Sequence, residues 1–272
     1  MAFHHARGFK LHYVINPHKA PNTRETGGLP QPCYVLSHGL FFGNLSAWYP
    51  LFTEALSNRG DTLCYDHRGH GLSEITANGY KLEDHVDDLD TLISELGWED
   101  RAICFIGHSY GARVGLSLAA KRYLLRSEHR DQVILIDPPL LSYDQSEDPL
   151  FKDLTIERLE EIKEALPNDL TTLFSRKGRR FKKMFKRWEQ LVKETTFCQD
   201  LRALPSLSEN EIAYLSRVDA ALFGSESGCI DGRSVLEQYL TAERVQVLQG
   251  GGHFLLNENP EFVLQFVLGH CL

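Results

Sequence analysis

Short apolar runs alternate with helical patterns along most of this chain, and this alternation limits the possible folds more than any other feature. Seven runs predict strands: KLHYVI, CYVLSHG, TLCYDHRG, AICFIGHS, QVILIDPP, DAALFGS and RVQVLQG. Residues 82–96 carry apolar side chains at helical spacing, and residues 112–125 and 259–270 also predict helices. Strands that alternate with helices predict a mostly parallel sheet with helices on both faces.

Residues 143–216 interrupt this alternation, because helix formers and charged residues dominate there and no convincing strand is found. The segment lies between two predicted strands. We therefore expect a helical cap inserted into a core that residues 1–142 and 217–272 form together. A chain of 272 residues is long enough for one large domain with such an insertion.

Composition and charge exclude several classes of protein. No stretch approaches eighteen apolar residues and the first residues lack the apolar middle of a secretory signal, so we expect a cytoplasmic protein without a transmembrane segment. The net charge of −8 disfavours nucleic acid as a partner. The six cysteines show no metal-ligand spacing, so we expect neither a disulfide framework nor a structural zinc site. We expect no cofactor and no metal.

A single serine stands at a sharp change of predicted structure. In GHSYG, Ser109 follows a predicted strand and precedes a predicted helix, which is the context of a nucleophile elbow. Gly107 and Gly111 allow the backbone to turn there without clashes. The amide of Tyr110, at the start of the helix, could donate to an oxyanion. A serine hydroxyl is a weak nucleophile, so this site needs a base within hydrogen-bond reach.

Among the twelve histidines, His253 is the candidate base. It lies in QGGGHF, between the last predicted strand and the last predicted helix, where three glycines allow a close approach to a neighbouring loop. We expect His38 and His108, which lie beside glycines at strand ends, to serve in packing or hydrogen bonding. The loop after VLSH offers a second oxyanion donor in the backbone amide of Leu40 or Phe41.

The turn YDHRGHGLS, residues 65–73, has ligand-type side chains in Asp66, His67 and His70. We interpret this turn as scaffold rather than as a metal site, with Arg68 bracing neighbouring loops.

The segments HGLFFG, DHRGHGLS, GHSYGA and GGGHF, in this order, resemble the motifs of the α/β-hydrolase family over nearly the whole chain. The resemblance implies the α/β-hydrolase fold, with a mostly parallel eight-stranded sheet, an inserted helical cap and a catalytic triad at the C-terminal edge of the sheet. It implies that Ser109 is the nucleophile and His253 the base. It assigns the oxyanion hole to Tyr110 together with Leu40 or Phe41.

The acid of the triad departs from the family pattern. The usual aspartate ends a Gly-x-x-Asp stretch after the strand that follows the cap, but here Ser227 occupies its place. Asp137, at the end of the preceding strand, and Glu226, one residue out of register, are the two alternatives. We prefer Asp137, because it faces the same edge of the sheet as Ser109 and two prolines stiffen the backbone after it. Some family members, such as haloalkane dehalogenases, carry their acid at that strand end.

A basic segment lies within the predicted cap. Residues 176–187 hold eight lysines and arginines, and Phe181, Phe185 and Trp188 fall at i, i+4 and i+7 to form one apolar stripe. The simplest interpretation is a cap helix with its stripe on the core and its charges in water. The alternatives are contact with the phosphates of coenzyme A, with an acidic acyl carrier protein or with an anionic lipid surface.

Together these features predict a serine hydrolase that cleaves a small-molecule ester or thioester through an acyl-enzyme, with Ser109, His253 and Asp137 as its triad. A carbon–carbon bond hydrolase or an acyltransferase on the same scaffold would use the same residues. The alternative from another class is a non-catalytic protein of this fold that binds a small molecule.

Overall fold

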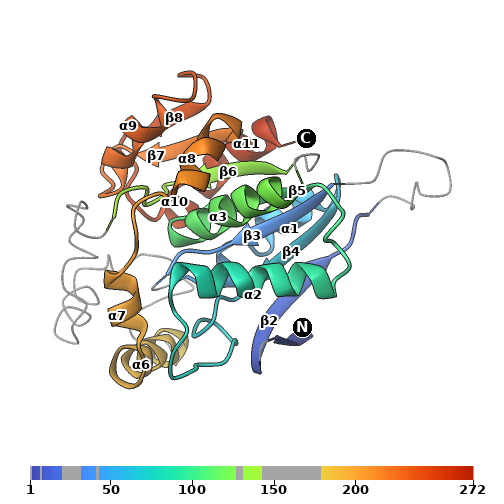
Figure 1. Cartoon of the computed structure of the whole chain (residues 1–272), viewed down its shortest axis with the longest axis vertical. Coiled ribbons are helices and arrows are strands. Elements are labelled where there is room, and N and C mark those ends of the chain that lie inside the picture. Colours follow the sequence, from blue (N-terminus) through green and yellow to red (C-terminus); the bar gives the residue numbers. More distant parts are fainter. Residues whose placement is uncertain are drawn as a thin grey trace.

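The computed structural model describes residues 2–6, 8–19, 32–40, 43–126, 131–142 and 179–271. Eight strands form one sheet in the order β1-β2-β4-β3-β5-β6-β7-β8 (Figure 1). Strand β2 pairs antiparallel with both β1 and β4, and the other neighbours are parallel. The strands are β1 (Ala2–Ala6), β2 (Phe9–Asn16), β3 (Cys33–Ser37), β4 (Asp61–Tyr65), β5 (Ile103–His108), β6 (Gln132–Ile136), β7 (Ala220–Gly224) and β8 (Val245–Leu248).

The predicted sheet is therefore confirmed, and the seven apolar runs correspond to β2 through β8. Strand β1 was not among the predicted strands. Its sequence AFHHA is short and holds two adjacent histidines, and it joins the sheet at the edge by antiparallel pairing with β2.

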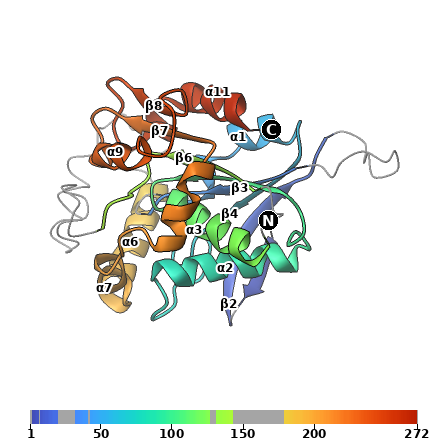
Figure 2. The same cartoon turned by 45° about the horizontal axis from the view of Figure 1, so that its top comes forward.

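Helices cover both faces of the sheet (Figures 1 and 2), as the alternation predicts. Successive strand residues face opposite sides. Val35 packs into a cluster with α2 (Leu82–Glu95) and α3 (Tyr110–Leu125), whereas Tyr34 and Leu36 pack into a cluster with α1 (Leu51–Leu56) and α11 (Pro260–His270). The helices and short 3-10 turns are η2 (Leu45–Ala47), α1 (Leu51–Leu56), α2 (Leu82–Glu95), α3 (Tyr110–Leu125), α6 (Arg179–Glu194), α7 (Phe197–Arg202), α8 (Glu209–Tyr214), η4 (Leu215–Arg217), η5 (Ile230–Gly232), α9 (Arg233–Leu236), α10 (Leu255–Glu258) and α11 (Pro260–His270).

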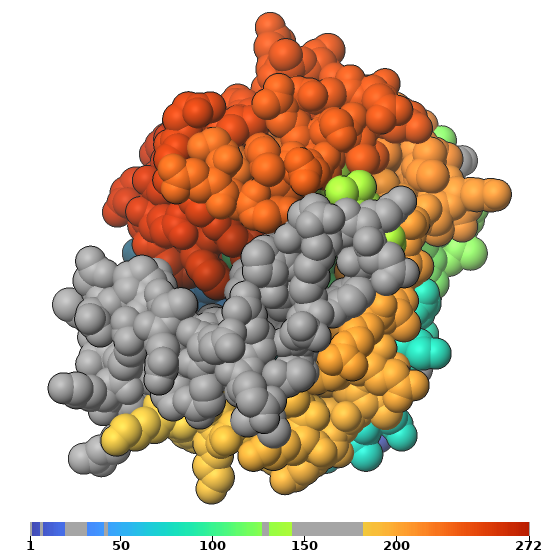
Figure 3. All heavy atoms as spheres, turned by 90° about the vertical axis from the view of Figure 1, so that its left-hand side faces the viewer, coloured from blue at the N-terminus to red at the C-terminus, as the bar shows by residue number. Residues whose placement is uncertain are grey.

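Within the segment predicted as the cap, the described part is helical from α6 to α8. Residues 143–178 lie outside the described residues, so the division into core and cap stays a prediction. Helix α8 packs on α3, where the buried Glu211 accepts a hydrogen bond from Ser117 (2.6 Å) and pairs with Arg113 (3.3 Å). Figure 3 shows the face on which α6 and α7 lie at one side and the C-terminal residues at the other.

Helix α6 separates its apolar and basic side chains. Phe185 and Trp188 are buried, whereas Lys182, Lys183 and Lys186 are exposed. This arrangement agrees with an apolar stripe on the core and charges in water. The side chain of Phe181 and residues 176–178 lie outside the described part of the chain. None of the described helices is long and apolar enough to cross a membrane.

Candidate active site

Ser109 stands at a strained corner between β5 and α3. Its backbone has φ +54° and ψ −127°, a region that non-glycine residues rarely adopt. The Ser109 N–H donates to the Ile136 carbonyl (2.8 Å), and the Ser109 carbonyl accepts from Ala112 (2.9 Å). These two hydrogen bonds fix the corner from which the hydroxyl reaches His253.

The two glycines of GHSYG have no room for a side chain. A Cβ on Gly107 would lie 2.4 Å from the backbone nitrogen of Ala112, and a Cβ on Gly111 would lie 2.4 Å from the Ser37 carbonyl oxygen. Both distances are far below van der Waals contact. The elbow therefore forms only with glycine on each side of its serine.

His253 reaches the elbow from the loop between β8 and α10. Its Nε2 lies 2.9 Å from the Ser109 hydroxyl, although the two residues are 144 positions apart in the chain. The His253 carbonyl accepts a hydrogen bond from His108 Nε2 (2.7 Å), and the preceding Gly252 N–H donates to Glu258 (2.7 Å). The first contact holds the loop against the end of β5, and the second holds it against α10.

Of the two candidate acids, the structure brings Asp137 to His253. The Asp137 side chain is fully buried, with Oδ2 2.6 Å from His253 Nδ1 and Oδ1 accepting from the Gly224 N–H (3.0 Å). Its backbone has φ +48°, and its N–H donates to the Leu222 carbonyl (2.7 Å). Glu226 is exposed, so it does not share this buried position.

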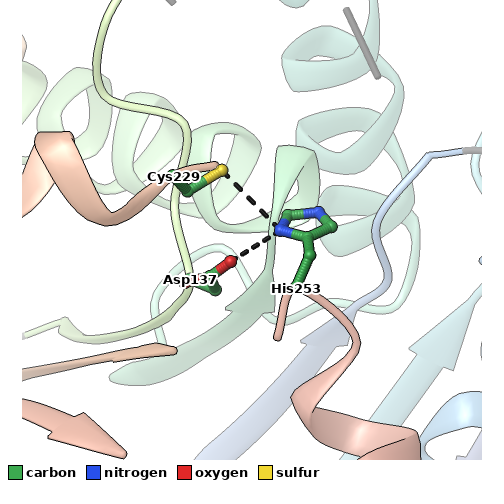
Figure 4. A group of neighbouring side chains, drawn as sticks. All are labelled: Asp137, Cys229 and His253. Atoms are coloured by element: carbon green, nitrogen blue, oxygen red, sulfur yellow. Dashed lines mark hydrogen bonds and ion pairs between the residues drawn. The ribbon is translucent and has the colours of Figure 1, made fainter. Parts of the chain in front are cut away.

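Two residues beside this pair were not predicted to belong to the site. Ser227, in the place of the usual aspartate, donates a hydrogen bond to Asp137 and lies 3.4 Å from His253 Nδ1. The Cys229 sulfur lies 3.7 Å from the same nitrogen (Figure 4). The position of Ser227 in the Gly-x-x-Asp register was a usable signal, but no sequence signal pointed to Cys229.

The surroundings of His253 set its protonation. Burial alone lowers the pKa of His253, but Cys229 and Asp137 next to Nδ1 raise it, and the result lies well above the ordinary value of 6.5. For His108, the effect of the Asp137 carboxylate is smaller than the effect of burial. Burial and the nearby His253 lower the pKa of His108 to about 4, so it remains neutral at physiological pH.

The two described candidates for the oxyanion hole, Tyr110 and Leu40, lie on α3 and on the loop after β3, which meet at Ser109. Tyr110 is the first residue of α3, and its side chain is buried. Leu40 follows β3, and a Cβ on the neighbouring Gly39 would lie 3.0 Å from Ser109 Cβ, so this loop touches the elbow. Phe41 lies outside the described residues.

The polar side chains of the turn of residues 65–73 form hydrogen bonds with other parts of the protein and within the turn. Asp66 accepts from the backbone N–H groups of Leu45 and Leu72 (2.8 Å each) and from His12 (2.6 Å). Burial raises the pKa of Asp66, but these hydrogen bonds and nearby histidines lower it to a net value below 3.8. The carboxylate thus ties β2 and the segment after residue 43 to the turn.

The other polar side chains of the turn also have partners. His67 Nε2 lies 2.8 Å from the His38 carbonyl, and His70 Nδ1 lies 2.9 Å from the Arg68 carbonyl. Arg68 donates two hydrogen bonds to Asp88 (3.0 and 2.6 Å). These contacts agree with a role as scaffold.

Known proteins that are similar to this chain include one family and, among three curated relatives, the two named next. The family model described as "Alpha/beta hydrolase family" matches residues 34–266. The chain is 40% identical over 100 residues (37% of the chain) to 2-(acetamidomethylene)succinate hydrolase of Mesorhizobium japonicum. It is 33% identical over 108 residues (39% of the chain) to RutD of Agrobacterium fabrum, provisionally named a carbamate hydrolase. The matches span 34% and 38% of these relatives, about a third of their length.

Among solved structures, the enol-lactonase of Burkholderia xenovorans LB400 is similar over 99% of both chains, with 20% sequence identity and a TM-score of 0.67. At this identity the likeness shows a shared fold.

Proposed function

This chain belongs to the α/β-hydrolase family, and on that premise we propose that it hydrolyses a small-molecule ester or thioester through an acyl-enzyme. One observation carries the proposal. The Ser109 hydroxyl lies 2.9 Å from His253 Nε2, and on the other side of the ring His253 Nδ1 lies 2.6 Å from Asp137 Oδ2. The three side chains therefore form one continuous chain of hydrogen bonds. This order of nucleophile, base and acid is the arrangement that acyl transfer to a serine requires.

In the first half-reaction, Ser109 Oγ attacks the acyl carbon while His253 Nε2 accepts the hydroxyl proton. The oxyanion that forms on the carbonyl oxygen accepts hydrogen bonds from the amides of Tyr110 and of Leu40 or Phe41. When the tetrahedral intermediate collapses, His253 Nε2–H donates the proton to the leaving alcohol or thiol. The acyl group remains bound to Ser109.

Water completes the cycle. His253 Nε2 removes a proton from the water as its oxygen attacks the acyl carbon, and the proton then passes to Ser109 Oγ as the acid leaves. In both halves Asp137 keeps the Nδ1–H directed toward itself and stabilises the imidazolium. The contact with Gly224 and the hydroxyl of Ser227 hold the carboxylate in that position.

A carbon–nitrogen bond is the second candidate for the bond that is cleaved. One relative is named as the hydrolase of a compound with an acetamido group, and the other is provisionally named a carbamate hydrolase. Both groups contain a bond between a carbonyl carbon and nitrogen. The same residues serve this chemistry, because His253 Nε2–H can protonate a leaving nitrogen as it does an oxygen or sulfur.

The test is a rate comparison on three substrate panels of matched acyl length: p-nitrophenyl esters, acyl-coenzyme A thioesters, and N-acyl or carbamate compounds. We expect turnover on at least one panel, labelling by a fluorophosphonate, and loss of both in Ser109→Ala. A correctly folded wild-type protein that neither turns over nor labels would support the non-catalytic binding protein instead.

Contact with coenzyme A or an acyl carrier protein through the basic segment is a separate part of the proposal. Its support is the exposed ammonium groups of Lys182, Lys183 and Lys186 on α6. Replacing all three by glutamine should raise KM for acyl-coenzyme A and reduce its salt dependence, while KM for p-nitrophenyl esters stays the same. If the substitutions left KM for acyl-coenzyme A unchanged, these lysines would be a solvated face without a role in binding.

A further inference from the structure

The thiol of Cys229 lies beside the proposed triad, and it has no role in the proposed serine mechanism. Cys229 precedes η5 in the segment that follows β7, and 6% of the residue is exposed. Its N–H donates to Ser227 Oγ (3.1 Å), the same hydroxyl that donates to Asp137. The sulfur lies on the Nδ1 side of His253 (Figure 4), whereas the Ser109 hydroxyl lies at Nε2.

Three metal-ligand atoms meet at this point. One carboxylate oxygen of Asp137, the Cys229 sulfur and one ring nitrogen of His253 all lie within 4.8 Å of one another. The sulfur lies 3.7 Å and the carboxylate oxygen 2.6 Å from Nδ1. Bond lengths to tetrahedral zinc place nitrogen and sulfur donors about 3.5 Å apart and nitrogen and oxygen donors about 3.3 Å apart. Relative to Nδ1, the sulfur thus needs to move by only about 0.2 Å, whereas the carboxylate oxygen must retreat by roughly 0.7 Å. The sulfur and the carboxylate oxygen, which lie within 4.8 Å of each other, must come to about 3.5 Å apart.

We propose that Asp137, Cys229 and His253 form an inhibitory site for a thiophilic divalent cation of the Zn²⁺ type. The inhibitory part rests on the proposed function, because it acts on the same histidine. The donor set of one thiolate, one imidazole and one carboxylate suits Zn²⁺ and excludes Mg²⁺ and Ca²⁺, which prefer oxygen ligands. Water completes the fourth position, as in other sites with three protein ligands.

Binding changes the proton positions in a way that stops catalysis. The cation takes the lone pair of Nδ1, so the ring hydrogen that pointed at Asp137 moves to Nε2, and the Cys229 thiol releases its proton to solvent. The ring then presents Nε2–H to Ser109 and has no lone pair left to accept the hydroxyl proton. The Ser109 hydroxyl loses its base while every atom of the elbow stays in place.

The experiment is a titration of the full chain with Co²⁺ alone, followed by Zn²⁺ competition. We expect one Co²⁺ per chain with a thiolate-to-Co²⁺ charge-transfer band in the near ultraviolet. Zn²⁺ should displace the Co²⁺ and suppress turnover, a chelator should restore turnover, and Mg²⁺ should have no effect. Cys198→Ser, which changes a free cysteine on α7 outside the site, is the matched control and should behave as wild type.

Cys229→Ser should lose the charge-transfer band, and its rate should no longer fall on Zn²⁺ addition when compared with its own metal-free rate. His253→Ala, whose ring is partly exposed, is the second variant and should weaken Co²⁺ binding at least about tenfold. Thermal unfolding of each variant establishes that it is folded. A wild-type chain without the band, or a band that persists in Cys229→Ser, overturns the site.

The two proposals fail separately. Normal hydrolysis with no Co²⁺ band overturns only the cation site. A Co²⁺ band in a chain that hydrolyses nothing supports the site and contradicts the proposed function.

Discussion

The ends of β6 and β7 lie side by side at one edge of the sheet, yet they offer His253 different groups. The strands pair in parallel, with Ile136 opposite Leu222. Beyond β6 stands the buried carboxylate of Asp137, and beyond β7 stand the hydroxyl of Ser227 and the exposed side chain of Glu226. The usual family pattern places the acid at the second strand end, but in this structure the carboxylate at Nδ1 comes from the first, where some family members carry it.

Contact with Nδ1, and not the identity of the strand, therefore decides which carboxylate can serve. The backbone of Asp137 adopts φ +48°, a conformation that aspartate tolerates better than most residues, and this turns its side chain toward β7. There Oδ1 accepts from the Gly224 N–H, so the carboxylate from β6 also caps the end of β7. The hydroxyl of Ser227 completes the arrangement by donating to the same carboxylate.

The strongest test of this comparison removes the charge at the end of β6. Asp137→Asn should lower kcat by about 10³- to 10⁴-fold, because an amide no longer fixes the imidazole tautomer or stabilises the imidazolium. The measurement is kcat on the best substrate of the panels, with thermal unfolding to establish that the variant is folded. Glu226→Gln is the control at the other strand end, and we expect it to stay within about twofold of wild type because exposed side chains contribute little.

The opposite outcome would reverse the assignment. If Glu226→Gln abolished turnover while Asp137→Asn changed it little, the acid would come from the end of β7.

A second test moves the charge from one strand end to the other. The double variant Asp137→Asn/Ser227→Asp should have a kcat at least about tenfold higher than Asp137→Asn alone, because a carboxylate is again within reach of Nδ1. Ser227 Oγ lies 3.4 Å from that nitrogen, so an aspartate there needs only a small shift to accept its hydrogen. The matched control is Asp137→Asn/Ser227→Asn, which has the same shape without the charge. Equal rates in the two double variants would contradict this account.

The third test removes the Ser227 hydroxyl, which links the two strand ends by donating a hydrogen bond to Asp137. Ser227→Ala leaves the buried Asp137 with one hydrogen bond fewer, and hydrogen bonds to charged groups contribute about 1.5–3 kcal/mol. We expect the free energy of unfolding to fall by about that amount, with kcat reduced roughly tenfold as the carboxylate loses its fixed position. Urea unfolding measures the first and steady-state kinetics the second. Ser225→Ala, two residues earlier on the same segment, is the control.

The sequence predicted those parts of the site that local residue patterns determine. The elbow at Ser109 and the glycine-rich approach to His253 are local, because neighbouring residues determine each turn. Asp137 could be preferred over Glu226 because parallel strand ends share one edge. Ser227 and Cys229 could not be assigned partners, since their contacts with Asp137 and His253 depend on how two loops from different strands pack. The edge strand β1 was missed for a similar reason, because its pairing with β2 rather than its own composition places it in the sheet.

The smallest expected effect is a shift in pH dependence, and it reports directly on the charge beside His253. Only neutral His253 can accept the Ser109 proton, so kcat/KM should fall as pH drops through the pKa of His253 in the free enzyme. Because Cys229 and Asp137 raise that pKa against the effect of burial, the midpoint of the acid limb should lie above 6.5. In Asp137→Asn the residual activity should show a lower midpoint, since burial continues to disfavour the imidazolium and the carboxylate that stabilised it is gone. Glu226→Gln should leave the midpoint where it is in wild type. A midpoint that stays fixed in Asp137→Asn and moves in Glu226→Gln would show that the charge felt by His253 comes from the end of β7, even if both variants remained folded and active.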